Sequence, residues 1–140
     1  MKTRLIILIC IATVFFSSML FLTFNAKKIK NSSLPQVTAE QLEKKMFVID
    51  GNSVKCYALP GKIRSQRGNY IIVSEEVNGD ECYFARKITF ETGAAEDGFY
   101  PVTGDSYNGE PVVISSDRAL FDGREVFLIQ VQAGHNARHD

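Results

Sequence analysis

The chain has 140 residues, of which 45% are hydrophobic and 23% are charged, with 16 basic and 16 acidic side chains. From Asn31 onward 11 basic residues face 16 acidic ones, so this part carries a net charge of −5. Such an acidic body excludes nucleic-acid binding as an expected function, because that function needs clustered positive charge. The length of this part of the chain allows a single domain.

The first 30 residues contain a long apolar segment. The 20 residues from Leu5 to Phe24 carry no charge, and a helix of that length spans roughly 30 Å, the thickness of a bilayer core. A cleaved secretory signal has a shorter apolar core and small residues before the cut, and Phe24 fits that rule poorly beside Ala26. We therefore expect residues 1–30 to be a membrane anchor or a signal segment. The domain that follows is expected in the periplasm or the extracellular space, on a single-pass protein of the cell membrane.

Residues 31–45 are predicted to form a linker. Their first part is polar and contains Pro35, which is typical of a connecting segment. Thr38 and Gln41 then have the spacing of a capping box, in which the two side chains satisfy the first backbone amides of a helix. This pattern predicts a short helix over residues 39–45.

From Met46 onward the pattern indicates β structure. Short apolar or alternating runs are separated by turn residues every 8–12 positions, and no helical pattern of 10–15 residues lies between them. We expect an all-β domain over residues 46–132, either a small antiparallel β-barrel or a closed sandwich, and a disordered tail over residues 133–140. The predicted strands cover residues 46–50, 53–59, 70–77, 81–91, 99–103, 111–115 and 124–131.

The strongest local signal is a β-hairpin around Asn78 and Gly79. These two residues suit the positive φ angles of a type I′ turn, which joins two antiparallel strands. Alternation along the returning strand predicts that one face is core, with Arg86 paired or near an edge. That face carries Cys82, Phe84, Arg86, Ile88 and Phe90.

The order of these features resembles the membrane-proximal β-domain of HlyD-like periplasmic adaptor proteins, the membrane fusion proteins of resistance-nodulation-division efflux systems. The segments that carry the resemblance are ALPGKI at 58–63, GNYIIV at 68–73, YFARKITFETG at 83–93, GFYPV at 98–102 and GEPVVI at 109–114. The resemblance as a whole covers roughly residues 56–130. The resemblance implies a β-barrel that contacts an inner-membrane transporter or another envelope protein. The family's long helical hairpin and lipoyl-like domain are missing from this sequence, which implies an isolated domain on its own anchor.

Few residues suggest reactive chemistry. Cys56 and Cys82 could form one disulfide in an oxidising compartment, or could be two buried thiols. His135 and His139 have the i, i+4 spacing of metal ligands on one helix face, with Asp140 as a further donor, but they lie in a polar terminal segment. The sequence contains no motif of a nucleophile, a phosphate loop or a metalloprotease, so we expect no catalytic residues and no cofactor.

These observations predict a non-enzymatic, membrane-anchored extracytoplasmic domain, an adaptor-like component of envelope transport or efflux. The expected partners are the membrane, through the N-terminal helix, and a transporter or other envelope protein, without nucleic acid. The alternative is a small ligand- or metal-binding periplasmic barrel that acts like a metal chaperone.

Overall fold

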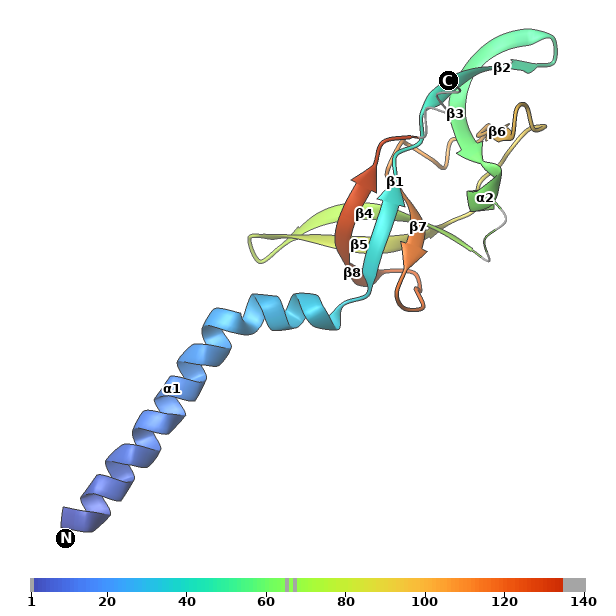
Figure 1. The fold of residues 1–140 in the computed structure, drawn as a ribbon. Helices are drawn as coiled ribbons and strands as arrows, with labels where there is room; N and C mark the ends of the chain where they lie inside the picture. The colour runs from blue at the N-terminus through green and yellow to red at the C-terminus, as the bar shows by residue number, and fades with distance from the viewer. Residues whose placement is uncertain (1, 65, 67, 135–140) are drawn as a thin grey trace. The chain divides into compact units, whose positions relative to one another are not determined.

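The computed structural model describes residues 2–64, 66 and 68–134. It contains two compact units that meet between Leu34 and Pro35. The first unit is one long helix, and the second contains all the strands (Figure 1). The β domain therefore begins at Pro35, well before its predicted start at Met46.

Helix α1 (Lys2–Ser33) contains the whole apolar segment, and by length and composition it is able to cross a membrane. Several of its hydroxyl groups are satisfied inside the helix: Thr13 Oγ1 donates to the carbonyl of Ile9, and Thr23 Oγ1 donates to that of Met19, both at 2.8 Å. Such bonds suit a lipid environment, which offers polar groups no other partner. The predicted membrane-length helix is thus present.

Among the residues that the structure describes, the second unit contains eight strands and one short helix, and the predicted all-β class is confirmed. All seven predicted strands are present within a few residues of their expected bounds. The elements are β1 (Gln36–Glu40), β2 (Lys44–Ile49), β3 (Asn52–Pro60), α2 (Gly61–Arg64), β4 (Asn69–Val77), β5 (Asp80–Ile88), β6 (Phe99–Pro101), β7 (Val112–Ser116) and β8 (Arg124–Gln132).

Five strands close into a barrel in the order β1-β7-β4-β5-β8, and β2, β3 and β6 form a separate three-stranded sheet. The barrel pairs are antiparallel except for one, because β1 runs antiparallel to β7 but parallel to β8. The barrel is therefore closed by a parallel pair between its first and last strands. The sequence predicted an antiparallel barrel, and this parallel pair is the exception.

The predicted helix over 39–45 is wrong. Residues 36–40 form strand β1, in which Val37 and Ala39 point into the barrel and are fully buried. Backbone pairing with two neighbouring strands outweighs the local capping pattern of Thr38 and Gln41. The short helix of this domain, α2, instead follows β3.

The hairpin between β4 and β5 forms as predicted. Asn78 and Gly79 have φ angles of 54° and 83°, and the strands pair in register from Val77 opposite Asp80 to Asn69 opposite Ile88. Asn tolerates the left-handed conformation and Gly adopts it without strain, so these two residues fix the turn and with it the register of the barrel's longest pair.

Apolar side chains fill the barrel from all five strands. The buried members of this barrel core are Val37, Ala39, Ile72, Ala85, Val113 and Val126. Two members of the predicted core face of β5, Cys82 and Ile88, are buried, and Arg86 on that face is paired as expected, with Glu75 at 3.0 Å. The prediction is incomplete, because Ala85 from the opposite face is fully buried inside the barrel. Both faces of β5 are thus partly covered, which alternation alone does not predict.

A second core lies where the barrel meets the three-stranded sheet. Its buried members are Leu42, Leu59, Ile63, Ile88, Val102, Tyr107 and Val112. Close by, the buried carboxylate of Glu40 on β1 forms an ion pair with Lys62 Nζ of α2 at 3.2 Å. The two sheets are thus joined by a continuous apolar contact and by a charged pair at its border.

Tyr107 is the polar residue of this second core. Its ring packs edge-on against Tyr57 and Phe90, and its hydroxyl donates to the carbonyl of Glu110 at 2.6 Å. Burial raises the pKa of Tyr107, and the nearby Tyr57 and Glu110 raise it further, although a backbone hydrogen bond from Leu42 opposes this shift. The folded domain therefore holds this phenol in its neutral form to a higher pH than the unfolded chain does.

We expect the domain to lose stability above about pH 10, the ordinary pKa of tyrosine, because the unfolded chain releases the Tyr107 proton while the fold retains it. Below that pH this contribution is fully present. Tyr107→Phe should cost about 1 kcal/mol at neutral pH through the lost hydrogen bond and should make the alkaline decline shallower. Denaturant unfolding of the full chain in detergent micelles between neutral and alkaline pH measures both effects. Parallel declines for the variant and the unaltered chain would contradict this assignment.

Candidate partner-binding surface

Strand β8 is paired differently along its two halves. Arg124, Glu125 and Val126 pair with β5, and the rest of the strand, from Phe127 to Gln132, pairs only with β1 among the residues that the structure describes. In Figure 1 the β4–β5 hairpin diverges from β8 at this point. The second half of β8 therefore has one backbone edge without a neighbouring strand in the described part of the domain.

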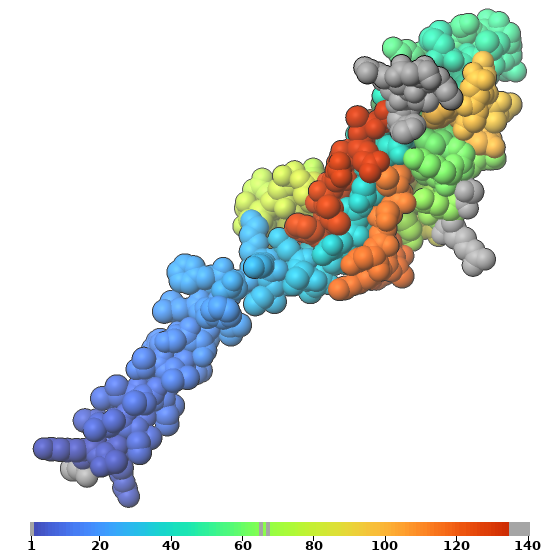
Figure 2. Space-filling model, viewed as in Figure 1, coloured from blue at the N-terminus to red at the C-terminus, as the bar shows by residue number. Residues whose placement is uncertain are grey.

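The same half of β8 carries three exposed apolar side chains, which we call the β8 patch. Phe127, Ile129 and Val131 are 37%, 56% and 42% exposed, and the pairing with β1 skips Ile129 in a β-bulge. Figure 2 shows β8, in red, along the surface of the domain. Bulges commonly redirect side chains at binding sites. Apolar side chains next to an open strand edge are the features of a surface that accepts another strand.

A second exposed apolar surface lies on the β2–β3 hairpin. Met46 and Val48 are both more than half exposed, and Met46 pairs across the hairpin with Lys55. Unlike the β8 patch, this surface lies on a hairpin whose register has no bulge. We therefore use Val48 below as an exposed control position.

The domain also has an open groove of about 400 Å³ between β4, β7 and the segment that follows β7. Among its described lining residues only Tyr70 and Arg118 have ionisable side chains, and the Tyr70 hydroxyl donates to the carbonyl of Leu120 at 2.9 Å. General acid–base catalysis needs two groups with different pKa values near one reacting atom. The described lining of this groove does not provide such a pair.

The cysteines singled out in the sequence do not form a disulfide in the structure. Cys56 is a half-buried thiol on β3, opposite Lys45, and Cys82 is a buried thiol on β5, opposite Glu75. The two strands belong to different sheets, so the two positions are not cross-strand partners. The alternative interpretation, two thiols that pack as small apolar groups, agrees with this placement.

The possible metal ligands His135 and His139, for which no metal site was predicted, lie outside the described residues, as do Asp140 and most of the predicted disordered tail. Within the described part of the chain no group of three or more His, Cys, Asp or Glu side chains is placed to hold a metal ion. The metal-binding alternative therefore gains no support from the described residues.

The β8 patch was missed by sequence reasoning, although a signal for it is present. The run VFLIQV at 126–131 is apolar at almost every position, whereas a strand with one solvated face alternates. Such a run predicts that both faces are covered. In the structure the barrel covers one of them, and the apolar side chains of the other face remain exposed among the described residues.

Comparison of the chain with protein-family models, with curated proteins and with solved structures finds no match.

Proposed function

We propose that this chain is a membrane-anchored, non-enzymatic binding module whose β domain lies outside the cytoplasm and acts as an adaptor-like component of envelope transport. The observation that carries this proposal is the β8 patch beside the open edge of the same strand. Helix α1 supports the anchoring, because its length and composition suit a membrane span.

The mode of binding follows from the backbone of β8. An extended segment of a partner adds to the edge beyond Val126 as one more strand, and its amides and carbonyls pair with those of Phe127–Gln132. Contacts with Phe127, Ile129 and Val131 then supply selectivity, because the burial of each side chain stabilises the complex by about 1–3 kcal/mol. Ile129 at the bulge is the most exposed of the three and should make the largest single contribution.

The kind of partner follows from the resemblance to periplasmic adaptor domains, which act beside inner-membrane transporters. A module held on the membrane by its own helix meets other membrane proteins at a high effective concentration. A transporter or another envelope protein with an extended segment near the bilayer is therefore the partner that we propose.

The experiment places a photo-crosslinking residue at Ile129 of the full chain in its native membranes. The control carries the same residue at Val48, which is exposed to a similar extent on the other surface. We expect a membrane protein to be captured from Ile129 and not from Val48, and Ile129→Asp to abolish its co-purification. In the purified complex, amide hydrogen exchange should slow along Phe127–Gln132.

Two results would argue against this function. Capture of the same proteins from Ile129 and Val48 would show non-specific contact. Unchanged hydrogen exchange along β8 in a purified complex would show that the partner does not use the strand edge.

A further inference from the structure

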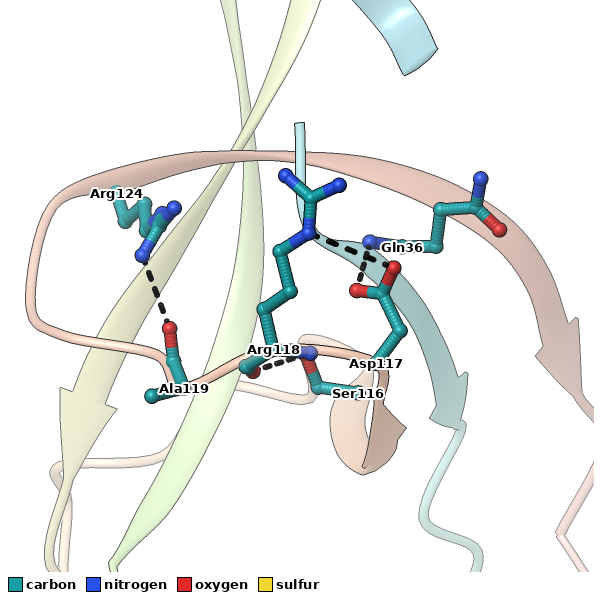
Figure 3. A network of polar contacts seen from close by, with 6 residues as sticks. All are labelled: Gln36, Ser116, Asp117, Arg118, Ala119 and Arg124. Atoms are coloured by element: carbon teal, nitrogen blue, oxygen red, sulfur yellow. Dashed lines mark hydrogen bonds and ion pairs between the residues drawn. The ribbon is translucent and has the colours of Figure 1, made fainter. Parts of the chain in front are cut away.

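The loop between β7 and β8, residues 117–123, is fastened to the first residues of the β domain. The backbone amide of Gln36 donates to Asp117 Oδ1 at 2.7 Å, and the amide of Asp117 donates back to the carbonyl of Gln36 at 3.1 Å. Nearby, the amide of Phe127 donates to the carbonyl of Pro35 at 2.8 Å. The loop therefore lies beside the start of β1 (Figure 3).

The loop is held in shape by further contacts. The carbonyl of Ala119 accepts from Arg124 Nη1 at 3.0 Å, the amide of Gly123 donates to the carbonyl of Ala85 at 2.8 Å, and Leu120 is fixed by the Tyr70 hydroxyl. In contrast, the Phe121 side chain is 58% exposed. A fixed loop thus presents a large apolar ring to its surroundings.

The side chains around this ring have the chemistry of a membrane interface. The Arg124 guanidinium lies 4.9 Å from the centroid of the Phe121 ring, and Arg118 is about half exposed on the same loop. Both acidic side chains of the loop have partners. Asp117 accepts from the amide of Gln36 through Oδ1 and pairs with Arg118 Nε through Oδ2 at 3.8 Å. Asp122 accepts from the amide of Lys87. Aromatic rings and arginines together suit the level of the lipid headgroups, where the ring meets the acyl boundary and the guanidinium meets phosphate.

Chain length keeps this loop near any bilayer that holds α1. The uncharged segment ends at Phe24, and the β domain begins eleven residues later at Pro35. The helical part of this interval, up to Ser33, rises about 14 Å, and eleven fully extended residues would reach at most about 40 Å. This tether, at most about 40 Å long, allows the loop fastened to Gln36 to reach the lipid headgroups.

We propose that the 117–123 loop is a second membrane contact, in which Phe121 inserts at the headgroup level of a phospholipid bilayer and Arg118 and Arg124 face its phosphates. This proposal rests on the proposed function in one respect, namely that helix α1 stays in the membrane as an anchor. The proposed contact would fix the orientation of the barrel relative to the bilayer. The loop would face the membrane, and the β8 patch would begin beside the membrane surface at Phe127.

The sequence permits a direct test, because the chain contains no tryptophan. Phe121→Trp in the full chain, reconstituted into phosphatidylcholine vesicles with or without phosphatidylglycerol, places a single tryptophan on the loop. We expect blue-shifted emission and quenching by lipids brominated close to the headgroup. Arg118→Gln in the same background should reduce the lipid-contacting population about fivefold, the loss expected for one basic residue at the surface.

Two further single-tryptophan variants serve as controls. Phe15→Trp in α1 should be quenched most by lipids brominated deep in the acyl chains, which reports insertion of the anchor. Val48→Trp on the β2–β3 hairpin should emit as in water and escape quenching. Near-ultraviolet circular dichroism of the tyrosines, which all lie outside α1, verifies the fold of every variant.

The outcomes separate the two proposals. If Phe15→Trp is quenched while Phe121→Trp emits as in water, the membrane-contact proposal is overturned and the anchored function stands. If Phe15→Trp is not quenched, the anchor itself is absent from the bilayer and both proposals fail. Equal quenching of Phe121→Trp and Val48→Trp would overturn the assignment to this loop.

Discussion

Leu59→Ala is expected to destabilise the β domain by about 2–5 kcal/mol, the cost of removing a buried leucine side chain and leaving a cavity. Leu59 is fully buried in the core that joins the barrel to the three-stranded sheet, where Ile63 and Val112 are fully buried as well. A domain of this size has a total stability of about 5–15 kcal/mol, so the variant should be unfolded in a measurable fraction of molecules. Denaturant unfolding of the full chain in micelles, followed by tyrosine circular dichroism, measures the change.

Leu59→Met is the matched control for this truncation. It nearly conserves volume, and it should cost less than about 1.5 kcal/mol. If Leu59→Ala cost no more than Leu59→Met, the joint between the two sheets would have to be loosely packed, contrary to the contacts described above.

Val126→Asp is expected to prevent the barrel from closing at neutral pH. Val126 is 2% exposed and lies in the barrel core with Val37 and Ala85, so an ionised carboxylate there would be desolvated without a partner. Burial would raise the pKa of the new carboxyl in the folded state. The destabilisation should therefore be smaller at acidic pH, where the carboxyl is protonated in both states, and larger as the pH rises.

Ile129→Asp, three residues along the same strand, is the control for this experiment. Its side chain is exposed in the described domain, so the free energy of unfolding should change by no more than about 0.5 kcal/mol. Thermal unfolding of both variants at neutral and acidic pH distinguishes an inward from an outward position. Similar melting temperatures for the two variants would contradict the assignment of Val126 to the barrel interior.

Much of the fold could be predicted because its signals are local. The turn at Asn78 and Gly79 needs positive φ angles that few residues adopt, and the apolar run from Leu5 to Phe24 permits few alternatives to a helix. Strand β1 was missed for the opposite reason. Its five residues carry a helix-capping pattern, and their strand conformation depends on β7 and β8, which lie more than 70 residues away in sequence.

The candidate surface could be predicted only in part. The continuous apolar run around Ile129 predicts that both faces of β8 are buried. It does not predict that one face is exposed in the described domain. That feature depends on where β5 leaves β8, after the pair of Tyr83 with Val126, and no local pattern encodes such a divergence. The sequence left open whether Cys56 and Cys82 form a disulfide, because alternation does not say which strands belong to one sheet.

The parallel pairing of β1 with β8 has a consequence for how the molecule is made. The barrel cannot close until Arg124–Gln132 has emerged, although its partner Gln36–Glu40 is synthesised about 90 residues earlier. Contacts of such high sequence separation slow folding. Until β8 is available, the backbone groups of β1 that face it have no strand partner. The last strand of the chain therefore decides when the first strand is protected on both edges.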